Sequence, residues 1–249
     1  MFSAVLPARI KAFLLHLAAS LLVALLALCL VFGVWYPPPL DSALAVQQVF
    51  VMLVAIDVIL GPSLTLLVYK VGKKSLRMDL AVIVLVQLLA LSYGLWVVAQ
   101  ARPAWLVFNA DRFDLVQAVD IDLRTDESVA TEYRQPAWSG PVWVGAVAPV
   151  DIEKRNAITF EAALGGSDIA QRPNLYVPLA TLSESIDKKI QDLSTLEHFN
   201  DRNAVRDALA AWPQARGWLP LMARAQPMVV LMGPEPAQVL AVVALKPWE

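Results

Sequence analysis

The chain has one cysteine and two histidines among its 249 residues. The cysteine, Cys29, lies inside a long apolar run, so the rest of the chain can form neither an internal disulfide nor a cysteine-rich zinc site. A lipid anchor at Cys29 is disfavoured, because apolar sequence continues beyond it and Leu28 precedes it where a small residue is needed. No small-x-small cleavage site follows the run, so we interpret it as a retained helix and not as a removed signal peptide.

Motifs for common enzyme chemistry are also missing. The sequence contains no nucleophile elbow, no His-Glu-x-x-His, no phosphate-binding glycine loop and no dinucleotide fingerprint. Gly165-Gly166-Ser167 lacks the lysine of a phosphate loop and follows a predicted helix instead of opening one. His198 stands alone at a predicted helix end, where it is more often a cap than a base or a ligand. We therefore expect no enzyme, no cofactor, no metal site and no small-molecule substrate.

A basic stripe is lacking as well. Up to residue 101 there are six Lys and Arg residues against three acidic ones, and the remainder has 14 basic and 19 acidic residues. The second part is thus net negative, and phosphate neutralisation supplies most of the affinity of proteins for nucleic acids. We expect no nucleic-acid partner.

Long apolar runs dominate the first hundred residues. Hydrophobic residues make up 58% of the chain, and most of the excess lies in three runs. Each run is near the ~20 residues that cross the hydrocarbon core of a bilayer as a helix. The alternative, a buried helical hairpin in a globular core, fits three such runs poorly. We predict a transmembrane domain over residues 1–101, embedded in the lipid bilayer, with spans at about 12–36, 46–69 and 80–100.

The positive charges predict the orientation of these spans. Arg9 and Lys11 precede the first span, four basic residues lie between the second and third, and residues 37–45 contain none. By the positive-inside rule the N-terminus is cytoplasmic and the domain at 102–249 is periplasmic. The aromatic residues agree, because Tyr69 falls at the inner interface and three others at the outer one, namely Trp35, Tyr36 and Trp96.

Asp57 is the one acidic residue near the middle of a span. A carboxylate there costs ~2.5–3.5 kcal/mol on insertion scales, so its side chain must face protein. It could clamp the second span to the third through Gln87, Ser92 or Tyr93, or it could contact another membrane protein. Gly61-Pro62 follows one turn later and should kink the helix. Asp57, Gly61 and Pro62 are our candidate partner-binding residues within the membrane.

The second part alternates short strand and helix signals. Asp151 can cap a helix that ends at Gly165-Gly166, and Thr181-Leu-Ser-Glu184 resembles a capping box. Together these signals predict one α+β domain, with a helical layer on a small, mostly antiparallel sheet. We expect helices at 151–165, 179–196 and 202–212, and strands at 105–109, 113–119, 142–147, 228–232 and 239–245.

Several short motifs, in order along the chain, resemble the TfpX/TfpZ family of type IV pilin accessory proteins. The resemblance covers nearly the whole chain, is densest from about residue 11 to residue 121, and is absent from residues 123–150. The motifs that carry it are Val34-Trp35-Tyr36-Pro37, Asp57-Val-Ile-Leu-Gly61-Pro62-Ser-Leu-Thr-Leu, Gly72-Lys73-Lys74-Ser75-Leu76-Arg77 with Asp79-Leu80, Asp111-Arg112-Phe113, Gly165-Gly166-Ser-Asp168-Ile-Ala170 and Tyr176-Val-Pro178.

The resemblance implies a non-enzymatic, chaperone-like factor of the bacterial inner membrane. Such a factor binds and stabilises a type IV major pilin and supports pilus assembly. A membrane-anchored periplasmic sensor or a small transporter subunit is the alternative. A sensor needs a cytoplasmic output module, for which the predicted cytoplasmic segments are too short, and a transporter normally has more spans and more intramembrane polar groups.

Overall fold

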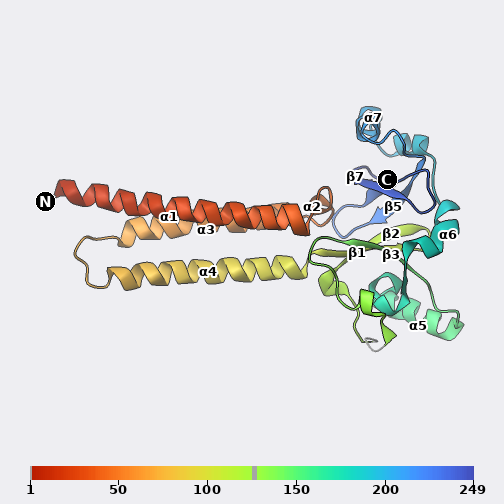
Figure 1. Cartoon of the computed structure of the whole chain (residues 1–249), viewed down its shortest axis with the longest axis horizontal. Helices are drawn as coiled ribbons and strands as arrows, with labels where there is room; N and C mark the ends of the chain where they lie inside the picture. The colour runs from red at the N-terminus through yellow and green to blue at the C-terminus, as the bar shows by residue number, and fades with distance from the viewer. Residues whose placement is uncertain (1, 125–127) are drawn as a thin grey trace. The chain divides into compact units, whose positions relative to one another are not determined.

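The computed structural model describes residues 2–124 and 128–249. The chain forms two compact units (Figure 1). The helical unit comprises Met1–Val34 and Val46–Gln100. The sheet unit comprises Trp35–Ala45 and Ala101–Glu249, so the link between the first two long helices belongs to the sheet unit.

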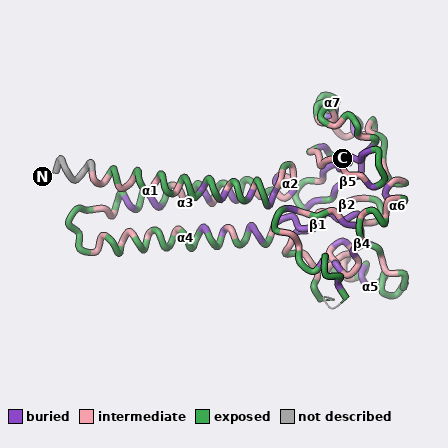
Figure 2. Tube along the Cα trace, viewed as in Figure 1, coloured by how far each residue is buried: buried purple, intermediate pink, exposed green. Residues whose placement is uncertain are grey.

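The helical unit consists of three long apolar helices. They are α1 (Phe2–Leu30), which continues as the π-helical turn Val31–Trp35, α3 (Val46–Val68) and α4 (Leu76–Gln100). Each is long and apolar enough to cross a membrane, and the first candidate span begins at Ala8. Most of their large apolar side chains are exposed, as in helices that face lipid. Figure 2 colours much of the trace of these helices as exposed. The predicted spans are thus confirmed as apolar helices, with ends shifted by a few residues, whereas the π-helical turn was not predicted.

Helix α3 is the centre of this unit. Both α1 and α4 pack along α3, while α1 and α4 hardly touch one another. Gly94 of α4 allows close approach, because a Cβ there would lie 2.5 Å from Leu53 Cδ1 of α3. The Arg9 guanidinium of α1 donates to the carbonyls of Leu66 and Leu67, which caps the C-terminal end of α3.

In the described residues the sheet unit contains one seven-stranded sheet of order β4-β3-β1-β2-β5-β6-β7. Four neighbouring pairs are antiparallel, and the pairs β1–β3 and β2–β5 are parallel. The predicted α+β class with a mostly antiparallel sheet is therefore confirmed. The strands are β1 (Pro103–Asn109), β2 (Arg112–Gln117), β3 (Val142–Ala146), β4 (Tyr176–Val177), β5 (Gly217–Met222), β6 (Met228–Met232) and β7 (Val239–Val243).

Both faces of the sheet are covered. Side chains alternate along a strand, so Leu106 and Phe108 join one core while Trp105 and Val107 join another on the opposite face. Helix α6 (Ser183–Asp187) covers the first face through Ile186. Helix α7 (Arg202–Ala210) and the 3-10 turn Leu193–His198 cover β5–β7 on the other face.

The helices only partly follow the sequence prediction. Asp151 caps α5 (Ile152–Ala163) by accepting from the backbone N–H groups of Glu153 and Lys154, as predicted. The prediction of a single helix over residues 179–196 is wrong. The segment instead contains the 3-10 turn Leu179–Leu182, α6 and the 3-10 turn Leu193–His198.

The cause of this split is a pairing with the sheet. Gln191 forms an isolated bridge with Trp218 through two backbone hydrogen bonds of 2.9 and 3.0 Å. The bridge needs extended backbone at Gln191, which no helix provides. The proposed capping box is also wrong, since the N-cap of α6 is Leu182 and has no side-chain capping bond.

Strand β5 was not predicted, and Pro220 in its middle explains the omission. Proline cannot donate to a ladder and argues against a central strand. Trp218 bonds Gln191 on the side away from β6, and Pro220, two residues on, faces that same side. On that side of β5, strand β2 pairs only with Leu221 and Met222. The missing N–H of Pro220 therefore removes no hydrogen bond between strands.

The segment Trp35–Ala45 is built into the sheet unit. Leu40 and Ala43 of α2 (Leu40–Ala43) are buried in the core formed with Phe108, Leu219 and Met228. The Ala43 carbonyl accepts from the N–H groups of residues 225 and 226 at 3.0 and 3.2 Å. The link between α1 and α3 is therefore a structural part of the sheet unit.

Candidate functional site

Asp57, the candidate with the strongest physical argument, is the twelfth of the 23 residues of α3. Gln87 of α4 donates from Nε2 to the backbone carbonyl of Asp57 at 3.0 Å and also interacts with its carboxylate. Gln87 is thus one of the three partners expected for Asp57. The contact joins α3 to α4 at the middle of both helices.

Gly61 lies one turn after Asp57 and is buried. A Cβ at this position would lie 2.0 Å from Gln87 Nε2. The missing side chain therefore makes the space in which the Gln87 amide reaches Asp57. Pro62 is also buried within α3, and its missing N–H leaves the carbonyl of Val58 without its helical partner. Gly61 and Pro62 are thus both buried in the helical unit.

Helix α1 brings a further polar contact. His16 Nδ1 lies 2.6 Å from Thr65 Oγ1 of α3, and Thr65 is buried. The two residues are 49 positions apart, and the sequence shows no signal that pairs them. Knowledge of which face α1 presents to α3 would be needed to predict the contact.

A cavity of about 110 Å³ lies between the side chains of His16, Asp57 and Gln87. All three long helices contribute to its wall, and Asp57 is the residue that α3 supplies. The cavity is lined by His16, Ala19, Ser20 and Val23 of α1, by Asp57, and by Val84, Gln87, Leu88 and Leu91 of α4.

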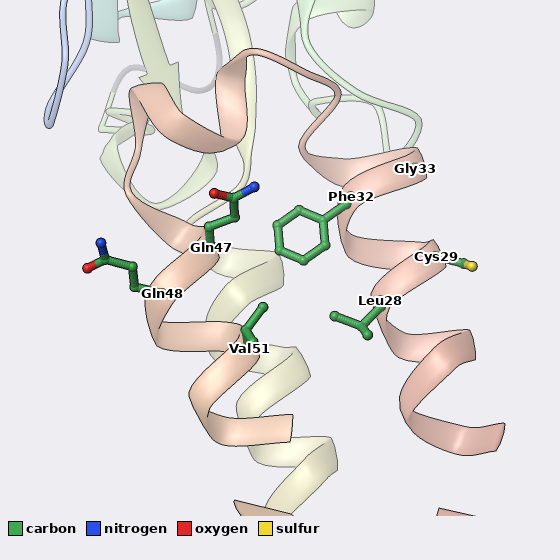
Figure 3. Close-up of a pocket in the computed structure, with 7 residues that line it drawn as sticks. All are labelled: Leu28, Cys29, Phe32, Gly33, Gln47, Gln48 and Val51. Carbon is green, nitrogen blue, oxygen red and sulfur yellow. The ribbon is translucent and has the colours of Figure 1, made fainter. Parts of the chain in front are cut away.

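A second, open hollow lies between the π-helical end of α1 and the start of α3 (Figure 3). Leu28 and Phe32 point toward α3, whereas the Cys29 thiol points away (Figure 3). Gln47 and Gln48 form the polar edge of the hollow. Its wall is otherwise apolar and contains no charged residue, so it offers packing surface and little chemistry.

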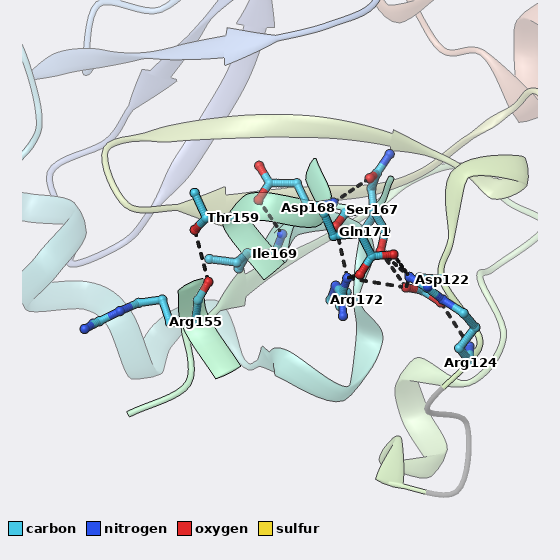
Figure 4. Close-up of polar contacts among 10 residues, drawn as sticks. Asp122, Arg124, Arg155, Thr159, Ser167, Asp168, Ile169, Gln171 and Arg172 are labelled. Carbon is cyan, nitrogen blue, oxygen red and sulfur yellow. Dashed lines mark hydrogen bonds and ion pairs between the residues drawn. The ribbon is translucent and has the colours of Figure 1, made fainter. Parts of the chain in front are cut away.

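The strongest electrostatic cluster of the sheet unit surrounds Asp122 (Figure 4). Its carboxylate pairs with Arg124 at 2.5 Å and accepts from Ser167 Oγ at 2.5 Å. The hydrogen bond from Arg124 is the main cause that holds the Asp122 pKa well below its usual range. Arg172 pairs with Glu161 of α5 at 2.5 Å, and its guanidinium comes within 3.9 Å of Asp122. The cluster ties α5 to the segment after β2, which is a structural role.

A groove of about 610 Å³ runs along β2, between the segment 165–171 and the residues at the end of β5. It carries charges of both signs, because Arg112 pairs with Asp114 at 3.0 Å and Arg224 donates to Gln117 at 3.3 Å. Burial raises the pKa of Asp114. These four side chains are thus paired with one another within the groove.

The described residues contain no group of three His, Cys, Asp or Glu side chains that could hold a metal ion. His198 lies in the last turn of its 3-10 segment, beside the Phe199 ring. The polar groups of the helical unit are thus the best candidates for a functional role.

Comparison with known proteins identifies the family. A family model described as "Fimbrial assembly protein FimB" matches residues 5–44, which cover most of α1 and of the link to α3. The "Fimbrial assembly protein, serogroup E1" of Dichelobacter nodosus is 32% identical over 206 residues, which cover 81% of this chain and 79% of the relative. The serogroup I protein of that organism is 33% identical over 182 residues, covering 72% and 70%.

A third relative from Dichelobacter nodosus, for serogroups C1 and C2, is 35% identical over 109 residues, which cover 43% of this chain and 83% of the relative. No solved structure matches the fold. Two relatives above 30% identity, each matched over at least 70% of its length, establish the relationship. The chain belongs to the family of fimbrial assembly proteins.

Proposed function

We propose that this chain is a non-enzymatic, chaperone-like accessory factor of the bacterial inner membrane, of the TfpX/TfpZ kind. It binds a type IV major pilin, stabilises the subunit before assembly and supports pilus formation. The observation that carries the proposal is the similarity to a fimbrial assembly protein along about four fifths of both chains, a length that includes parts of both units.

The two units suit a partner with one membrane helix and one globular head, such as a pilin subunit. The helical unit can contact the helix of the subunit, and the sheet unit can contact its head. Two weak contacts on one chain reinforce each other, because the first contact raises the effective concentration of the second. The exposed apolar helices offer packing surface within a bilayer, where close fit and polar contacts govern association.

The proposed orientation places the sheet unit in the periplasm. Residues 35–45 and 101–249 form one compact unit, so the ends of the first and third spans lie on one side of the membrane. The basic loop between α3 and α4, with Lys73 and Lys74, then lies on the opposite side, which the positive-inside rule makes cytoplasmic.

Fusions test this orientation. Alkaline phosphatase fused after Glu249 should be active, because the enzyme needs the oxidising periplasm, and a fusion at Lys73 should be silent. The opposite pattern would contradict the topology and the proposed contact with the pilin head.

Deletion tests the function itself. A strain without this chain should have fewer pili and less partner pilin at steady state, while pilin transcription is unchanged. Immunoblots of pilin, transcript measurement and electron microscopy provide the readouts. Normal pilin level and normal piliation in the deletion strain would refute the accessory role.

A further inference from the structure

Two of the three long helices of the helical unit hardly pack against one another. Helices α1 and α4 flank α3 and hardly touch one another, so a groove runs between them. The cavity beside Asp57 lies in this groove, because α1 and α4 supply all of its other lining residues. Val84 and Leu88 of α4 are 42% and 50% exposed, and Val23 of α1 is 37% exposed, so these groove side chains are only half covered by their own chain. A fourth helix could complete their packing.

Asp57 and Gln87 present hydrogen-bond acceptors to the cavity, and His16 and Ser20 line its α1 side. Gln87 uses its Nε2 group on Asp57, while its Oε1 atom is buried and has no hydrogen-bond partner. The Asp57 carboxylate accepts hydrogen bonds when ionised. An acceptor that lacks a hydrogen-bond partner in an apolar environment is energetically costly. A group that donates a hydrogen bond to Gln87 Oε1 is therefore favoured here. A space of 110 Å³ accommodates one short polar side chain or a few waters.

The depth of Asp57 in the membrane restricts which kind of partner can reach the cavity. Asp57 is central in α3, so in a spanning helix it lies near the middle of the bilayer. A loop or a soluble ligand would have to bring unpaired backbone or a hydration shell to that depth. A helix satisfies its own backbone and can offer a single side chain, which makes it the only regular element that suits the groove.

We propose that the groove between α1 and α4 binds the membrane helix of the pilin subunit, and that this helix places one hydrogen-bond-donating side chain against Asp57 and Gln87. The donor is a hydroxyl, an amide, an ammonium or a protonated carboxyl group. This inference rests on the proposed function and adds the position and the chemistry of the contact. Asp57 is thereby assigned to partner binding, and the bond from Gln87 to its backbone carbonyl holds α3 to α4 whichever side chain residue 57 carries.

Photocrosslinking from two neighbouring positions tests the location. A photoreactive amino acid replaces Leu88, which lines the cavity, or Leu89, which does not line it and is 61% exposed. In native membranes that contain the full chain and its pilin, we expect a pilin adduct from position 88 and at least several-fold less from position 89. Equal yields, no adduct at position 88, or an adduct with a different protein there would overturn the proposal.

Substitution of Asp57 tests the chemistry. In chains that carry the photoreactive residue at position 88, Asp57→Leu removes the acceptor and should lower the pilin adduct roughly 3- to 10-fold, the factor that one interhelical hydrogen bond in a membrane supplies. Asp57→Asn keeps an acceptor oxygen and should retain more adduct than Asp57→Leu. Ser63→Leu is the matched control, because Ser63 is an exposed polar residue of the same helix outside the cavity. Adducts of wild-type yield from both Asp57 variants would refute the donor contact.

The membrane level of each variant is measured in parallel, and adduct yields are compared per folded chain. The deletion strain separates this inference from the proposed function. Loss of pilin on deletion, with no adduct at position 88, overturns the groove and leaves the accessory role standing. Normal pilin on deletion overturns the accessory role, whatever crosslinks at position 88.

Discussion

Replacement of Leu40 by alanine should destabilise the sheet unit by about 2–5 kcal/mol, the usual cost of such a truncation in a packed core. Leu40 is 4% exposed and packs in the core of a sheet whose strands begin more than sixty residues later. Pulse proteolysis of the full chain in detergent, at increasing urea, measures the free energy of unfolding of this unit.

The matched control is Leu164→Ala, the same truncation at a side chain that is 74% exposed. We expect it to change the stability by less than about 0.5 kcal/mol. If Leu40→Ala cost no more than this control, the link between α1 and α3 would not be part of the sheet core.

Replacement of Trp218 by alanine should have a still larger effect, about 3–5 kcal/mol. Trp218 is completely buried, and its Nε1–H donates to the Asp192 carbonyl and to Thr195 Oγ1, both at 3.0 Å. Its loss leaves a large cavity and removes the donor from two acceptors. Because domains are stable by only ~5–15 kcal/mol, a substantial part of the sheet unit should unfold under mild conditions.

Two further variants separate the causes. Trp218→Phe keeps most of the apolar volume and loses the donor, so its cost should be clearly smaller than that of alanine. Trp138→Ala is the exposed control, because Trp138 is 62% exposed; its ring lies beside Trp35 and under the Arg102 guanidinium. An equal effect of Trp218→Ala and Trp138→Ala in the same proteolysis assay would contradict the central role of Trp218.

The elements that the sequence predicted well are those with local signals. Asp151 caps α5 because a carboxylate accepts from the N–H groups that open a helix, and this depends only on nearby residues. Strand β6 is an uninterrupted apolar run, Met228–Met232, and was predicted with the correct ends. The cost of a carboxylate in an apolar segment singled out Asp57, and Gln87 is one of the three partners that the sequence allowed for it.

The elements that were missed depend on contacts between distant residues. The periodicity of residues 179–196 predicts one helix, but the bridge from Gln191 to Trp218 stops it. Pro220 argues against a strand unless the unpaired side of β5 is known. The contact of His16 with Thr65, and hence the cavity, requires the rotation of α1 against α3, which the nearly uniform hydrophobicity of α1 does not reveal.

The place of residues 35–45 in the sheet unit has a practical consequence for anyone who wishes to study that unit alone. A fragment that starts at residue 102 lacks Leu40 and Ala43, and with them the acceptor that the N–H groups of residues 225 and 226 use. Its core would be open to water where these side chains pack. Joining residues 35–45 to residue 101 by a short flexible linker would replace the two membrane helices and restore the missing wall, so the tethered fragment is the form to express, crystallise and assay against a pilin head.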